Sequence, residues 1–191
     1  MDGKVNPAPT PTPEYWDEAT AKRMEGSVET KAISNVPSGA TIPKAAIMGK
    51  DAEGKPALLK YATVFADTTA AATSIKVTKN SLISAGDVLS DGENVVAVSS
   101  INTSNADYDT LTVASGGLGV KKLAGDALFI AKSASELVPS VKPFGFVFAD
   151  VKKESNNKVD VVIWALNVKI NLPDEVKDLM PNFVFNPFFK Y

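Results

Sequence analysis

The pattern of apolar and polar positions predicts short strands along most of the chain from residue 42 onward. Apolar runs of a few residues recur between Gly, Asp, Asn and Ser, which is typical of strands joined by tight turns. The first pair is a predicted hairpin over residues 42–65, with Asp51-Ala52-Glu53-Gly54 as its turn. Further β-rich runs follow as SIKV, AGDVLSDGENVVAVSSI, DYDTLTVASGGLG and AGDALFIAK. This spacing predicts a mainly β protein, built as a small barrel or sandwich.

The strongest strand signals lie at residues 144–149 and 158–170. In the second segment, apolar side chains fall on both faces of the predicted strand. One face holds Val159, Val161, Ile163 and Ala165, and the other holds Val162, Trp164, Leu166 and Val168. A strand with two apolar faces lies in the centre of a sheet or beneath a partner chain. Trp164 is therefore a candidate partner-binding residue.

Residues 1–40 form a predicted N-terminal arm. The prolines of residues 6–13 favour an extended, semi-rigid strap, because each one fixes φ and removes a backbone donor. A short helix is predicted after the strap, with acidic residues early, basic residues late and Gly26 at its end. Such a short helix needs a surface to pack on. We expect its Tyr15 and Trp16 to anchor the arm on a partner, or else to fold back on the chain's own body.

The C-terminal residues combine a second short helix with an aromatic tail. The segment 172–183 predicts a helix that starts near Asp174 and stops before a proline. Residues 183–191 then hold five aromatic rings, including Phe188 and Phe189. Such a tail is expected to be buried, either in the chain's own body or in a neighbouring subunit. Phe188 and Phe189 are therefore also candidate partner-binding residues.

The tripeptide Ala-Gly-Asp occurs at residues 85–87 and again at 124–126. The simplest interpretation is structural: glycine permits a turn, aspartate accepts hydrogen bonds from nearby amides, and Leu89 and Leu128 enter the core. Calcium binding is the rival interpretation, because loop carboxylates supply oxygen ligands. The candidate ligands would be Asp87, Asp91, Glu93, Asp107, Asp109 and Asp126. Their spacing does not match an EF-hand loop, so we predict a structural role without a metal or cofactor.

The composition removes several classes of function. The 191 residues include no Cys and no His, which excludes His-based triads and the usual zinc hydrolase sites within this chain. The net charge of -2 favours neither nucleic-acid nor membrane-surface binding. No apolar run reaches the roughly 18 residues of a membrane helix, and we expect no secretory signal. A carboxylate-based hydrolase stays open as an alternative, although we expect a protein that is not an enzyme.

Residues 65–132 resemble a β module of structural proteins from tailed bacteriophages. The resemblance depends on the order of a TSIKV strand, a Gly-Asp, a strand carrying Val-x-x-Ile, the DTLTV strand and a second Gly-Asp. The flanking segments IPKAAIMGK, KPALLKYATV, PFGFVFADVKK and VDVVIWALNVKINLPDEV are similar to head-decoration and head-fibre base domains. Pro143, Gly145, Asp150 and Val151 fill the second of these motifs. The middle module separates the two halves of the flanking pattern, so we interpret it as an insertion.

This resemblance implies an organisation and a function. The arm at residues 1–40 would precede a discontinuous decoration-type domain at 41–66 and 141–191, with the inserted module at 67–140. The function implied is that of a virion protein on the capsid surface, either a head decoration protein or a head-fibre base. Its implied partners are the major capsid protein and other copies of itself in a homotrimer. The alternative is a receptor- or glycan-binding β module of a virion surface, which requires exposed aromatic residues on one β face.

Overall fold

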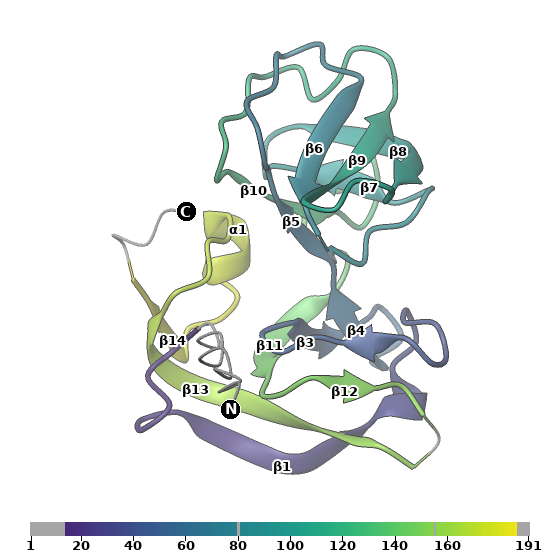
Figure 1. The fold of residues 1–191 in the computed structure, drawn as a ribbon. Helices are drawn as coiled ribbons and strands as arrows, with labels where there is room; N and C mark the ends of the chain where they lie inside the picture. The colour runs from purple at the N-terminus through teal and green to yellow at the C-terminus, as the bar shows by residue number, and fades with distance from the viewer. Residues whose placement is uncertain (1–13, 80, 155, 187–191) are drawn as a thin grey trace, which may run out of the picture.

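The protein is mainly β and consists of two stacked units (Figure 1). The computed structural model describes residues 14–79, 81–154 and 156–186. The lower unit, called the base, holds residues 14–59 and 141–186, and the upper unit, called the module, holds residues 61–131. The predicted fold class is therefore confirmed. Because the chain leaves the base, builds the module and returns, the base is discontinuous in sequence.

The base is built on a six-stranded sheet with a long central strand. Its strands are β1 (Lys22–Glu29), β3 (Ile47–Lys50), β4 (Pro56–Leu59), β11 (Lys142–Val147), β13 (Lys158–Val168) and β14 (Phe183–Phe185). The order is β1-β13-β11-β3-β4, and β14 pairs with β13 in parallel. Val159 and Val161 belong to one apolar cluster and Val162 to another. Ala165, which the alternation predicts on the face of Val159, belongs instead to the cluster of Val162, so the strict alternation is broken toward the end of β13. The chain itself thus covers both faces of β13, and a central position explains its two apolar faces.

The base contains two predicted features, a hairpin within the sheet and a short C-terminal helix, together with smaller elements. β3 and β4 form the predicted hairpin, in which the Asp51 carboxylate accepts the N–H groups of Glu53 at 3.1 Å and Lys55 at 2.8 Å. The predicted C-terminal helix is present as α1 (Asp174–Lys177). The remaining elements are the short helix η1 (Thr30–Ala32) and the strand pair β2 (Thr41–Ile42) and β12 (Val151–Lys152).

The predicted N-terminal helix is wrong. Residues 22–29 form strand β1, which pairs with β13. A single turn precedes this strand, where the Asp17 carbonyl accepts the Ala21 N–H at 3.1 Å. Pairing along β13 outweighs the weak helical preference of a short segment that has few large apolar residues. The proline strap at residues 6–13 lies outside the described residues.

The acidic residues that suggested a helix dipole form ion pairs with lysines of the base. Glu14 lies 2.8 Å from Lys169, and Glu18 lies 2.7 Å from Lys44. The described part of the predicted arm is therefore joined to the base by a strand pairing and by side-chain contacts. It is a part of this unit and not a separate extension.

The module is a second six-stranded sheet that curls on itself. Its strands are β5 (Tyr61–Thr63), β6 (Ser74–Thr78), β7 (Val88–Ser90), β8 (Val95–Asn102), β9 (Tyr108–Val113) and β10 (Ala127–Ile130). They follow the order β5-β10-β7-β8-β9-β6, and a bridge between Val64 and Val77 links the two ends of this order. The sheet therefore wraps around an apolar core that includes Ile75, Leu89 and Leu111.

The two Ala-Gly-Asp tripeptides mark an internal duplication of the module. Each half supplies two strands, a Gly-Asp turn and a third strand: β5, β6 and β7 in the first half, and β8, β9 and β10 in the second. The turn at residues 86–87 bonds to both backbone groups of Val98, which belongs to the second half. The turn at residues 125–126 bonds in the same way to Val64 of the first half. Each half therefore completes the sheet of the other.

A narrow neck joins the module to the base. Lys60 alone separates β4 from β5, and its carbonyl accepts the Ile130 N–H at 3.0 Å. The module thus begins at Tyr61 and not at residue 67, because β5 pairs with β10. No helix in the described part of the chain is long and apolar enough to cross a membrane.

Candidate functional site

The repeated Ala-Gly-Asp tripeptides form two matching turns. Gly86 has a φ of 92° and Gly125 a φ of 93°, a conformation that residues with a Cβ rarely adopt. The Asp87 carboxylate accepts the Ser84 N–H at 2.7 Å, and the Asp126 carboxylate accepts the Leu123 N–H at 2.8 Å. The leucines that follow are buried in the module core, as predicted. These contacts confirm the structural interpretation of the repeat.

Three of the carboxylates considered as calcium ligands are paired with lysines instead. Asp87 lies 2.9 Å from Lys60, and Asp91 lies 2.7 Å from Lys122. The third pair joins Lys79 to Asp109 at 2.6 Å. Within residues 14–79, 81–154 and 156–186, no group of three or more acidic side chains is placed to hold a metal ion.

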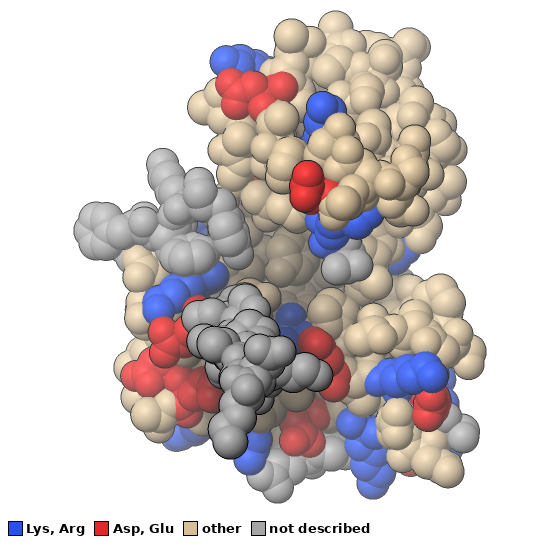
Figure 2. All heavy atoms as spheres, viewed as in Figure 1, with Lys and Arg blue, Asp and Glu red and all other residues tan. Residues whose placement is uncertain are grey.

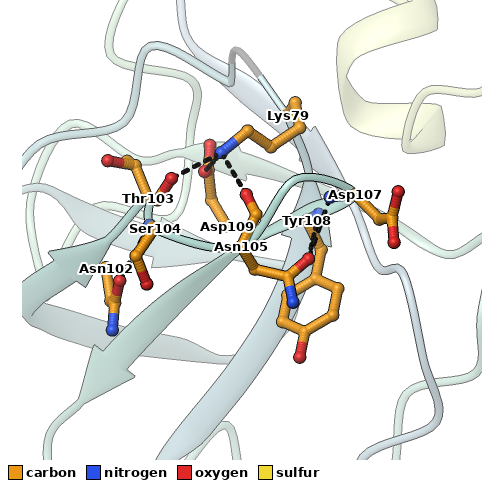
Figure 3. Close-up of polar contacts among 8 residues, drawn as sticks. All are labelled: Lys79, Asn102, Thr103, Ser104, Asn105, Asp107, Tyr108 and Asp109. Carbon is orange, nitrogen blue, oxygen red and sulfur yellow. Dashed lines mark hydrogen bonds and ion pairs between the residues drawn. The ribbon is translucent and has the colours of Figure 1, made fainter.

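Lys79 organises the loop between β8 and β9. Its ammonium donates to the carbonyls of Thr103 at 2.9 Å and Asn105 at 3.0 Å, and to the Asp109 carboxylate at 2.6 Å (Figure 3). Two carbonyls and one carboxylate are the oxygen set that a loop offers to a bound cation. Here the lysine ammonium occupies that position. Asp109 is only 5% exposed, so the pair fixes the loop from inside the module.

Trp16 is buried within the chain, which contradicts the expectation that it anchors an arm on a partner. Its exposed fraction is 0%, and its ring stacks on Phe146 of β11 with 5.9 Å between the centroids. Tyr15 is half-buried and lies 6.0 Å from the Trp16 ring. The alternative, in which these residues fold back on the chain's own body, is correct for Trp16. Of these two residues, Tyr15 keeps an exposed surface that a partner can contact.

The other predicted partner-binding residues are not brought together with Tyr15 in one site. Trp164 is partly exposed on β13, and the Lys22 ammonium lies 5.6 Å from its ring centroid. Phe188 and Phe189 lie outside the described residues. Tyr15 instead borders a hollow of about 480 Å³ that is also lined by Pro43, Lys44 and Phe148.

Sequence reasoning missed an exposed pair of aromatic residues on the module. Phe65 and Tyr108 have ring centroids 5.1 Å apart, and Phe65 is 43% exposed. The Lys76 ammonium lies 4.6 Å from the Tyr108 centroid. The sequence contains both residues, but the predicted hairpin holds Phe65 in its second strand, far along the chain from Tyr108. The pairing of β5 with β10 and the bridge between Val64 and Val77 bring Phe65 next to β6 and β9.

The neck holds a cavity of about 370 Å³ whose carboxylates, Asp51 and Asp87, serve the fold. Burial raises the pKa of Asp51, but hydrogen bonds from Lys55, Ser34 and Glu53 outweigh it and hold this pKa below its ordinary value. A general acid needs a raised pKa to keep its proton near neutral pH. Asp87 is held by Lys60. This arrangement does not favour a pair of catalytic carboxylates.

No protein-family model, no curated protein and no solved structure matches this chain.

Proposed function

We propose that the chain is a structural protein of a tailed-bacteriophage head, either a decoration protein or the base of a head fibre. The observation that carries this proposal is the separation of the chain into a base and a module joined by one narrow neck. In such an arrangement one unit can bind a capsid while the other points away from it. The base contains most of the segments that resemble head-decoration domains, although KPALLKYATV runs across the neck into β5, and the module contains the inserted β motif.

The surface of the base offers features suited to contact with another protein. The hollow beside Tyr15 and Phe148 combines aromatic and charged groups, since Lys44, Glu18 and Asp150 also line it. The Arg23 guanidinium lies 4.5 Å from the Phe148 ring centroid. In Figure 2, charged side chains of both signs gather on the visible face of the base, whereas the visible face of the module is largely uncharged. Aromatic residues and arginine are enriched in the centres of protein interfaces.

The homotrimer implied by the resemblance is part of the same proposal. The two apolar faces of β13 are covered by the chain itself and are not available for contact between subunits. A trimer would therefore have to form through other surfaces of the base. Light scattering of the purified protein measures this directly, and a particle near the monomer mass of 20.1 kDa would contradict it.

Cosedimentation with capsid shells tests the function. The shells are assembled from the major capsid protein encoded by the same genome, and the amount of bound chain is measured against it. The Tyr15→Ala variant is expected to bind about tenfold more weakly, since aromatic anchors dominate interface energies. Phe65→Ala on the module is the matched control and should bind as the unaltered chain does. Failure of the unaltered chain to bind the shells would refute the proposal.

A further inference from the structure

The exposed aromatic residues of the module form a compact surface with the loop beside them. We define the aromatic shelf as Phe65, Lys76, Tyr108 and the loop 102–107. We propose that the aromatic shelf binds a neutral carbohydrate, with a sugar ring packed on Phe65 and its hydroxyl groups bonded to the loop. This inference does not depend on the proposed capsid-binding function, which uses the base.

Buried and exposed side chains alternate along the chain at the shelf, and the aromatic rings lie on the exposed side. Val64 and Val77 are buried in the module core, while their neighbours Phe65 and Lys76 are exposed. The Phe65 N–H donates to the Lys76 carbonyl at 2.8 Å, which fixes the two residues side by side. Tyr108 pairs with Thr78 of the same strand as Lys76. Tyr108 belongs to β9, where successive residues face opposite sides, and Phe65 directly follows the bridged and buried residue Val64, so both rings lie on the outside of the module.

Lys76 and Phe65 hold the Tyr108 ring in place. The Lys76 ammonium lies over this ring, and the Phe65 ring is inclined to it by 37°. Phe65 is therefore the residue that offers an open ring face to a ligand. Full burial of a Phe side chain contributes about 1.5–3 kcal/mol, and Phe65, which is 43% exposed, forgoes part of that stabilisation in the free protein.

The loop next to the rings supplies polar groups in fixed positions. The Asn105 side-chain oxygen accepts the N–H groups of Asp107 at 2.8 Å and Tyr108 at 3.4 Å, which directs its NH₂ group away from the loop. Figure 3 shows this amide beside the Tyr108 ring, with the Asp107 carboxylate extending from the same loop. The hydrogen bonds from the Lys79 ammonium to the carbonyls of Thr103 and Asn105 fix the backbone of this loop. The shelf thus has a rigid donor, an exposed acceptor and an aromatic face.

This combination fits a sugar better than other ligand classes. A sugar presents an apolar ring face together with hydroxyl groups that both donate and accept hydrogen bonds, and pockets of this kind pair apolar area with a few placed polar groups. Single-stranded nucleic acid also stacks on aromatic residues, but it requires a continuous basic groove. Here Lys79 is paired with Asp109, and Asp107 places a negative charge beside the rings. Mixed charge with no excess of either sign favours a neutral sugar.

Glycan binding by the full chain tests the proposal. An array of neutral and acidic glycans is screened first, and neutral hits are measured by calorimetry and by saturation-transfer NMR. Phe65→Ala should weaken binding of a neutral hit about tenfold or more, a loss of about 1.4 kcal/mol. Asp107→Ala should weaken it as well. Leu123→Ala is the matched control, because Leu123 is an exposed apolar residue of the same module, and it should change nothing.

Three results would overturn the proposal. These are the absence of any glycan that binds at millimolar concentration, binding that Phe65→Ala leaves unchanged, and binding confined to acidic glycans. A folded Phe65→Ala protein is verified by its unaltered unfolding midpoint. Capsid cosedimentation of the same variant separates the two functions, since loss of glycan binding with intact capsid binding locates the sugar site on the module alone.

Discussion

Val98 and Asp87 belong to different halves of the module, yet the Val98 N–H donates to the Asp87 carbonyl at 2.9 Å. Val64 makes the equivalent contact with Asp126 at 2.8 Å. The aspartate side chains lock both turns, so their removal weakens the contact between the halves. We expect Asp126→Ala to lower the free energy of unfolding by about 1 kcal/mol through the lost turn bond.

Asp87→Ala should cost more than Asp126→Ala, about 2 kcal/mol, because it also leaves Lys60 in a largely buried position without its ion pair. Urea unfolding monitored by circular dichroism measures both changes. The control is Asp107→Ala, at an exposed position of the same module, which should shift stability by less than about 0.5 kcal/mol. Equal stabilities for the control and the two turn variants would contradict the structural role of the repeat. So would a marked rise in Tm with added calcium.

Two neighbouring glycines, Gly116 and Gly117, allow the cost of backbone strain to be measured apart from the cost of steric contact. Both have positive φ, of 95° and 60°. A Cβ at Gly116 would meet nothing within 4 Å, whereas a Cβ at Gly117 would lie 2.6 Å from the Ala70 carbonyl oxygen. Gly116→Ala should therefore cost about 1 kcal/mol, and Gly117→Ala should cost about 3 kcal/mol or more. Thermal unfolding of the two variants checks the order, and equal costs would show that the close approach is absent.

Lys79 should be one of the lysines whose loss most affects the module. Replacing it as Lys79→Met leaves the Asp109 carboxylate buried without its partner, and we expect a loss of about 3 kcal/mol. Lys121→Met is the matched control, since Lys121 and Asp67 lie 3.6 Å apart and both are well exposed. Its effect should stay below about 1 kcal/mol. Denaturant unfolding compares the two, and a Lys79→Met protein as stable as the control would contradict this role for Lys79.

Asp91 gives the module an acid-sensitive contact. Burial raises the pKa of this carboxyl, but hydrogen bonds from Lys122, Asn94 and Glu93 outweigh it and hold the pKa below the ordinary value of 3.8. A lowered pKa means that the folded state binds the proton less readily than the unfolded chain. The stabilisation is therefore complete above the ordinary value and is lost as the pH falls through the lowered one.

Measuring the free energy of unfolding at acidic pH tests this prediction for Asp91. The difference in unfolding free energy between the unaltered chain and Asp91→Asn should shrink as the pH falls below about 3.8. A constant difference for Asp91→Asn across this range would mean that the pKa of Asp91 is not lowered.

Trp16 contributes to the core of the base, so its replacement should destabilise the chain. Trp16→Ala is expected to cost about 3–5 kcal/mol. Trp16→Phe should cost much less, because Nε1 of the indole is buried without a hydrogen-bond partner among the described residues.

Deletion of residues 1–40 should prevent folding, since it removes strand β1, which pairs with β13. A truncated chain with unaltered stability would contradict the place of β1 in the sheet.

Local patterns predicted the strands and turns well, because turn chemistry and alternation act between near neighbours. The hairpin around Asp51 and the two Gly-Asp turns are examples. The helix expected after the strap failed because pairing with β13, distant in sequence, decided the conformation of residues 22–29. The aromatic shelf was missed for a similar reason. It depends on the pairing that closes the module beside Phe65 and Tyr108, and the local pattern of a single sequence does not reveal such long-range pairings.

The neck makes the chain a host for exchangeable domains. The two chain crossings lie next to each other, since the Lys60 carbonyl accepts the Ile130 N–H. A guest domain whose own ends are close together can take the place of residues 61–130 without stretching the base. Chains that share this base can therefore differ completely in the domain that they carry, because one continuous stretch of coding sequence can be exchanged without altering the rest of the fold.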